Sequence, residues 1–139
     1  MKFMILVKAT KDSEAGKMPG EALISEMVGF HEEMAKAGVL VDGSGLHPSS
    51  KGWRIKYGKG GKRTFVDGPF AETKELVAGF WLIQVKSKDE AVEWLKRAPF
   101  REGEVEIRQV FEAEDFAPSD PTGELRAAEE RLRAEVAGR

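Results

Sequence analysis

The sequence contains no cysteine and only two histidines. Without cysteine the chain can form neither disulfides nor thiolate metal sites, and this composition is typical of a cytoplasmic protein. The two histidines, His31 and His47, lie far apart and do not form a metal-ligand spacing. We therefore predict a cytoplasmic location, no bound metal and no cofactor.

Long hydrophobic runs are also missing. The opening MKFMILVKAT has only a short apolar run between Lys2 and Lys8, too short for a membrane helix or a signal-peptide core, so no membrane association is predicted. The net charge of −2 lacks the basic excess of most nucleic-acid-binding proteins, which argues against nucleic acid as a partner. With 139 residues, of which 41% are hydrophobic, the chain fits one globular domain.

Four strands and a hairpin are expected. The segments from Met1 to Lys8 and from Leu76 to Val85 are apolar on both faces, so we predict that both strands are central in a sheet. A shorter strand begins at Val39, and VEIRQVF forms the last strand. WRIKY and KRTFV flank the glycine-rich GKGG, which is a hairpin signal.

Apolar residues at helical spacing predict helices from Glu21 to Ala37 and from Ser87 to just before Pro99. This order predicts an α+β, ferredoxin-like fold, βαββαβ with an inserted hairpin, over residues 1 to 116. Residues 117 to 139 then form a linker, APSDPTG, and a C-terminal helix from Glu124 to Ala137.

This arrangement leaves one face of the sheet without helices, because two helices can cover only one side of four strands, whereas the central strands are apolar on both sides. A second copy of the sheet would cover that face and give a dimeric α+β barrel, with room for a ligand between the sheets. The C-terminal helix could provide part of the cover instead.

The stretch DGPFAETKE, from Asp67 to Glu75, connects the hairpin to the next central strand. Asp, Gly and Pro in succession are explained by a turn. The six residues that follow are more than a short connection requires, and they include one large apolar side chain and three charges. The stretch is therefore a candidate for part of a site.

Several motifs together resemble the DGPF branch of the YCII-related family: DGPFAETKE followed by GFW, the AG pair at Ala37 and Gly38, GLHPS, DEA and EIR. The resemblance spans Met1 to Phe111 and implies a dimeric ferredoxin-like, or α+β-barrel, fold in small bacterial proteins. It also implies two functional expectations. Some relatives are enzymes, including a dehydrochlorinase of a chlorinated hydroxyquinol with an expected His and Asp pair, and others are encoded near extracytoplasmic-function sigma factors.

His31 and Asp67 are the catalytic candidates. His31 lies about 60° from the centre of the apolar stripe of its helix. It is either a boundary histidine with a structural hydrogen bond, or a general acid or base that titrates near neutral pH and needs a carboxylate partner, for which Asp67 is the first choice. Asp67 could equally cap its own turn by accepting backbone N–H bonds, and the two roles are compatible.

The candidate ligand-binding residues are polar or aromatic side chains in the long loops and the last strand: Phe70, Glu72, Lys74, Arg108 and His47. The charges after Phe70 are either solvated ion pairs or the mouth of a pocket. Arg108 shares a face with Glu106, and either points to solvent or binds an anionic group between the sheets. Phe70 would anchor its loop on the core or across a dimer interface.

The hairpin from Lys51 to Arg63 contains six basic residues, Trp53 and Tyr57, and no acidic residue. Such interleaving is found in single-strand nucleic-acid sites, although a solvated hairpin explains it as well.

Two functional hypotheses follow. The first is a homodimer that binds a small aromatic or anionic metabolite, with cofactor-free, lyase-like acid–base chemistry as one form; whether the protein is an enzyme stays open. The alternative is a non-catalytic interaction protein that works with a transcription factor such as an extracytoplasmic-function sigma factor.

Overall fold

The computed structural model describes all residues from Met1 to Arg139. The chain divides into two compact units, Met1–Gln109 and Val110–Arg139. The boundary predicted after residue 116 lies inside the second unit. No helix is both long and apolar enough to cross a membrane.

The first unit is built on a four-stranded antiparallel sheet with the order β2-β5-β1-β6. The central strands are β1 (Lys2–Lys8) and β5 (Val77–Gln84), and the edge strands are β2 (Leu40–Gly45) and β6 (Val105–Gln109). The two segments that are apolar on both faces thus occupy the centre of the sheet, as predicted. A strand in the centre can be covered on both of its faces, which suits a segment that is apolar on both.

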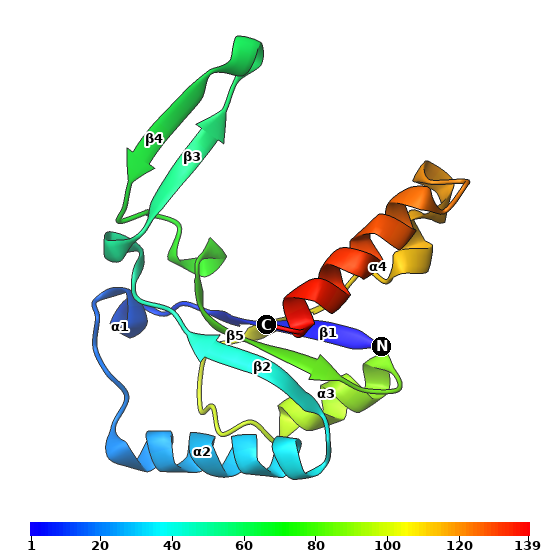
Figure 1. The fold of residues 1–139 in the computed structure, drawn as a ribbon. Helices are drawn as coiled ribbons and strands as arrows, with labels where there is room; N and C mark the ends of the chain where they lie inside the picture. Colours follow the sequence, from blue (N-terminus) through cyan, green and yellow to red (C-terminus); the bar gives the residue numbers. More distant parts are fainter. The chain divides into compact units, whose positions relative to one another are not determined.

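Helices α2 (Glu21–Lys36) and α3 (Lys88–Lys96) lie on one side of this sheet (Figure 1). Their apolar residues pack with one face of the central strands and form the core: Phe3, Ile5, Phe30, Met34, Val39, Trp81, Ile83, Val85 and Ala91. The ferredoxin-like α+β fold is therefore confirmed. A short helix α1 (Lys11–Glu14) was not predicted, since its single turn is held by the capping pair Thr10 and Ser13 rather than by an apolar stripe.

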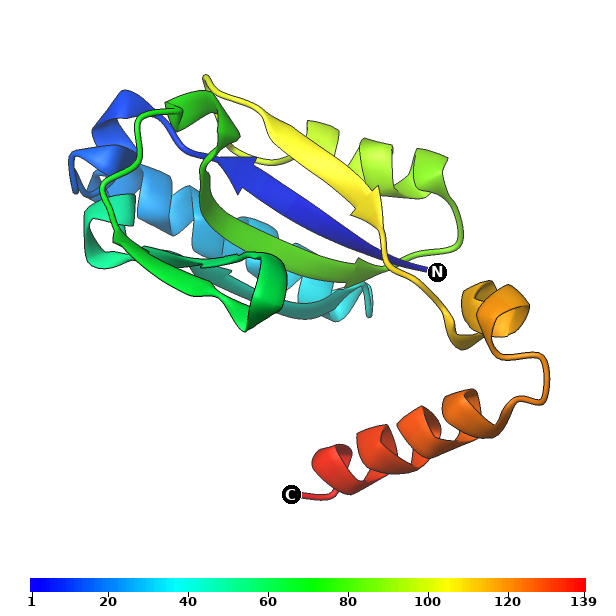
Figure 2. The ribbon, with the colours of Figure 1, turned by 90° about the horizontal axis from the view of Figure 1, so that it is seen from above.

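The opposite side of the sheet has no helix of the first unit on it, and we call it the open face (Figure 2). Exposure alternates along β1 and β5, with buried residues toward the helices and half-buried residues on the open face. By register the open face has an apolar centre of Met4, Leu6, Ala78, Phe80 and Leu82, a charged edge of Glu106 and Arg108, and a polar edge of Asp42 and Ser44.

The inserted hairpin forms a separate two-stranded sheet of β3 (Trp53–Tyr57) and β4 (Arg63–Asp67), as predicted. The hairpin is inserted in the sequence between β2 and β5, and it projects from the sheet on the side opposite α2 (Figure 1).

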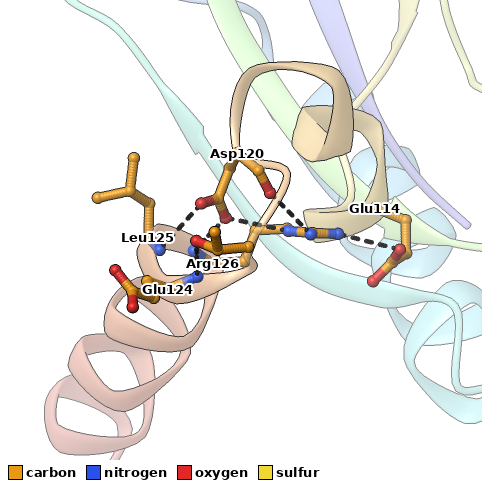
Figure 3. A network of polar contacts seen from close by, with 6 residues as sticks. Glu114, Asp120, Glu124, Leu125 and Arg126 are labelled. Atoms are coloured by element: carbon orange, nitrogen blue, oxygen red, sulfur yellow. Dashed lines mark hydrogen bonds and ion pairs between the residues drawn. The ribbon is translucent and has the colours of Figure 1, made fainter.

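The second unit is organised around Asp120, which is 6% exposed. A 3₁₀ segment (Ala113–Ser119) precedes it, and helix α4 (Glu124–Ala137) follows. The Asp120 carboxylate accepts the backbone N–H of Leu125 and of Arg126, at 3.2 and 2.9 Å, and the Nε–H of Arg126 at 3.1 Å (Figure 3). Because the N-cap residue Gly123 has no side chain, Asp120 caps α4 in its place.

We expect the helicity of α4 to depend on Asp120. The backbone N–H of Arg126, together with Leu125 and the Arg126 side chain, holds the pKa of Asp120 below its ordinary value of 3.8, although burial acts in the opposite direction. The charged form therefore stabilises the folded unit at any pH above that value, and this contribution is lost as the pH falls through the lowered pKa. Backbone chemical shifts of α4 should report stable helix at neutral pH and fraying in acid.

In the Asp120→Ala variant, α4 should lose most of its helicity even at neutral pH, since alanine has no acceptor for the backbone N–H groups of the first turn and a helix of this length is marginal without its cap. The exposed Glu130→Gln on the same helix is the control and should behave like the wild-type protein. Equal helicity in both variants would show that Asp120 does not hold the helix.

Candidate functional site

His31 lies half-buried on α2 against Trp81 of β5. Its Nε2 accepts a hydrogen bond of 2.9 Å from the Trp81 Nε1–H, and the two rings meet edge to face, with centroids 5.7 Å apart. Accepting at Nε2 requires the neutral tautomer with its proton on Nδ1. The one free lone pair of this imidazole is thus occupied, so His31 could act as a base only after releasing Trp81.

Gly43 of β2 makes room for the same indole. The register pairs Gly43 with Trp81, and a Cβ on Gly43 would lie 2.6 Å from Trp81 Cδ1. The glycine in this strand is therefore explained by the close approach of the Trp81 side chain, which in turn directs the indole N–H toward His31.

Asp67 ends β4 and is exposed. Neither a hydrogen bond nor an ion pair links it to His31, so the expected pairing of the two is not found. The expected turn cap is not found either, because the turn N–H of Gly68 donates to the Gly52 carbonyl at 2.9 Å rather than to the Asp67 carboxylate. The acceptor for the turn N–H is thus a backbone carbonyl at the base of the hairpin and not the Asp67 side chain.

Ser49 joins three segments that are distant in sequence. Its backbone N–H and its Oγ–H donate to the two carboxylate oxygens of Glu14, and its Oγ accepts the Phe70 N–H at 3.0 Å. The GLHPS and DGPF motifs are thereby fixed to each other and to α1. The roles of Ser49 and Glu14 were not predicted, since a contact across 35 residues has no local signal in the sequence.

Phe70 is half-buried, and the Arg54 guanidinium lies over its ring, 3.8 Å from the centroid. Phe70 therefore anchors its loop to the base of the hairpin, through a cation–π contact, rather than to the core of the sheet.

Arg108 and Glu106 lie together on the open face. Glu106 accepts from Arg108 Nη1 at 3.0 Å, and Lys8 Nζ lies 3.5 Å from its other carboxylate oxygen. The Arg108 hydrogen bond, followed by the charge of Lys8, holds the pKa of Glu106 below its usual range. Since only one guanidinium nitrogen of Arg108 is used, its other N–H groups can donate to a ligand.

Lys74 lies near Lys8 rather than beside His31. An open hollow of about 510 Å³ is lined by Lys8, Ala9, Lys74, Gly103 and Glu104. The candidates Glu72 and His47 are exposed and form no ion pair. The structure thus groups Lys8, Glu106 and Arg108 through their ion pairs, with Lys74 beside Lys8 in the hollow. Lys8 was not predicted, and His31 and Asp67 are not part of this group. No cluster of three potential ligands could hold a metal ion.

Three comparisons place the chain among known proteins. A family model of the YCII-related domain matches residues 1–114. An uncharacterized protein of Rhizobium meliloti (strain 1021) is 32% identical over 95 residues, which cover 66% of this chain and 76% of that protein.

Among solved structures, the 5-chloro-2-hydroxyhydroquinone dehydrochlorinase of Burkholderia phenoliruptrix AC1100, in complex with 2,5-dihydroxybenzoquinone, is similar over 83% of this chain and 98% of that chain. The identity is 13% and the TM-score is 0.47, so this likeness does not extend to activity. Because the family model matches residues 1–114, which are most of the chain, the chain belongs to the YCII-related family.

Proposed function

We propose that the protein binds a small aromatic anion on the open face, which a second copy of the chain covers. The observation that supports this most directly is the composition of that face: an apolar centre beside the guanidinium of Arg108. An aromatic ring fits on Phe80 and Leu82, and a carboxylate at one end of the ring fits the free N–H groups of Arg108.

The second copy is proposed because the open face is apolar and no helix of the first unit covers it. Half-buried Met4, Leu6 and Phe80 would gain stability from a cover, and a two-fold dimer supplies the same face twice. A cover also excludes water from around the guanidinium, which strengthens its hold on an anion.

A more specific version of this proposal is that the bound ligand also undergoes acid–base catalysis. Glu106 is charged at neutral pH and lies beside the proposed ligand position, whereas His31 is hydrogen-bonded to Trp81. Turnover through His31 and Asp67 would require both to move toward the ligand, so we propose binding as the primary function.

Benzoate is the probe for this site, with uncharged benzamide of the same shape as its counterpart. Titration followed by NMR shifts should detect benzoate binding at Met4, Leu6 and Phe80, with benzamide at least about tenfold weaker because it lacks the charge. Arg108→Gln should weaken benzoate binding about tenfold.

Arg101→Gln is the matched control. Arg101 is 73% exposed and forms a 3.0 Å ion pair with Glu26, while Arg108 is 70% exposed with a 3.0 Å ion pair to Glu106. If the two variants bind benzoate equally well, or if the shifts lie away from the open face, the proposal is wrong.

A second candidate function is an interaction protein, and one observation favours it. Helix α4 has exposed apolar residues on one stripe: Leu125 is 67% exposed, Leu132 54% and Val136 60%. Such a stripe suits docking to another protein, and a transcription factor is the partner that the family resemblance suggests. Capture from the native host with wild-type protein, but not with Leu132→Glu, would support this candidate.

A further inference from the structure

Lys8 is a mostly buried cation whose hydrogen-bonding capacity is not used within the chain. Its side chain is 14% exposed, and its ion-pair partner, the Glu106 Oε1, lies 3.5 Å from Nζ, which is longer than a normal hydrogen bond. An ammonium group has three N–H donors, and buried donors in proteins usually have acceptors. The Lys8 ammonium can therefore donate to a further acceptor that the chain does not supply.

The open hollow beside Lys8 provides space for that acceptor. Its volume is about 510 Å³, and three separate segments line it: Lys8 and Ala9 at the end of β1, Lys74 in the DGPFAETKE stretch, and Gly103 and Glu104 just before β6. Binding sites for small molecules commonly have volumes of this order.

Lys74 brings a second ammonium group to the hollow. Its side chain is exposed and forms neither an ion pair nor a hydrogen bond. The backbone fixes its place, because the Ala9 N–H donates to the Leu76 carbonyl at 2.9 Å and the Leu76 N–H donates to the Thr73 carbonyl at 3.1 Å. The loop of Lys74 is thereby tied to the end of β1, where Lys8 lies.

Backbone donors in the same lining add to the two ammonium groups. Gly103 has a φ of +88°, which glycine adopts without strain, and the N–H groups of Gly103 and Glu104 donate to no acceptor within the chain. Successive backbone N–H groups in turns commonly bind anions. The hollow thus has two cations and two free backbone donors.

The Glu104 carboxylate also lines the hollow, and its negative charge restricts which anion fits. A fully ionised anion such as sulfate meets a like charge at Glu104. A phosphate group that keeps a proton can instead donate its P–OH to the carboxylate, which is an acceptor only. Lysine is a common phosphate ligand because its ammonium is a compact point charge.

We infer that this hollow binds a phosphate group, held by Lys8 and Lys74 and recognised through its remaining proton by Glu104. The site is separate from Arg108, so the inference does not rest on the proposed function. It gives Lys74, and with it the charged part of DGPFAETKE, a role that a turn alone does not explain.

Inorganic phosphate is the probe, because it keeps a proton at neutral pH. Titration of the full chain at low ionic strength should shift the backbone NMR signals of Gly103 and Glu104, with a dissociation constant of about 1 mM. Sulfate has the same shape but no proton, and it should bind about tenfold more weakly.

Three variants test the assigned roles. Lys74→Gln should fold like the wild-type protein, since Lys74 is exposed, and should weaken phosphate binding about tenfold. Lys59→Gln is the matched control, because it removes an exposed lysine without an ion pair from the hairpin turn, and it should leave binding unchanged. Glu104→Gln should bind sulfate and phosphate about equally well, because the charge that excludes sulfate is removed.

Glycerol phosphate identifies the source of the phosphate group. If it binds at least as tightly as inorganic phosphate, the hollow takes a phosphate ester, and if only inorganic phosphate binds, it takes the free ion; both results support the inference. Three results would overturn it: no shift at Gly103 and Glu104, equal binding of phosphate and sulfate by the wild-type protein, or equal phosphate binding by Lys74→Gln and Lys59→Gln. None of these bears on the proposed function, which is tested with benzoate and Arg108→Gln.

Discussion

Replacing Gly68 by alanine should lower the free energy of unfolding by about 3 kcal/mol, the upper end of the usual cost of inserting atoms into a packed site. A Cβ at this position would overlap the Ser49 carbonyl oxygen and lie 3.2 Å from the Gly52 carbonyl oxygen. Both are backbone atoms, which cannot rotate away as a side chain would. Relief of the overlap must therefore separate the turn from the Ser49 loop and weaken the hydrogen bond from Gly68 to Gly52.

Urea unfolding measures this difference, and Gly45→Ala is the matched control. Gly45 has no atom within 4 Å of the added Cβ and has no positive φ, so its substitution should change stability by less than about 0.5 kcal/mol. A Gly68→Ala variant as stable as Gly45→Ala would mean that the two loops are not packed as described.

Replacing His31 by alanine should lower the free energy of unfolding by about 2 kcal/mol, because it leaves the Trp81 Nε1–H, in a residue 5% exposed, without its acceptor. The loss should be smaller in a Trp81→Phe background, where the donor is already absent, with a coupling of about 1 kcal/mol.

His47→Ala is the control for this prediction, since His47 is exposed and forms no hydrogen bond through its side chain; its substitution should have almost no effect. Additive losses in the double variant would contradict the structural role of His31 and reopen its role as a base.

The fold could be predicted from sequence because its main signals are local. Two-faced apolar strands, a helical stripe that includes Met27 and Met34, and the glycine-rich turn of the hairpin each reflect the environment of their own segment. The C-terminal helix was predicted with its observed bounds, Glu124–Ala137, although its cap Asp120 was placed in a linker.

The contacts of the candidate site could not be predicted in the same way. His31 was expected to need a carboxylate partner, but its partner is the indole of Trp81. The indole can lie close to β2 because Gly43 has no side chain. Asp67 was expected to cap a turn that the Gly52 carbonyl satisfies instead. Arg108 and Glu106 were predicted on one face from alternation alone, yet the addition of Lys8 depended on the sheet order, which brings β1 beside β6.

The central claim is that a second copy covers the open face and that an anion binds there beside Arg108. Native mass spectrometry of protein purified from its own host tests this claim most directly. The account predicts a dimer with additional mass from a small molecule, and no such mass in the Arg108→Gln protein prepared in the same way. A monomer without additional mass, or a dimer whose bound molecule persists in Arg108→Gln, would contradict it.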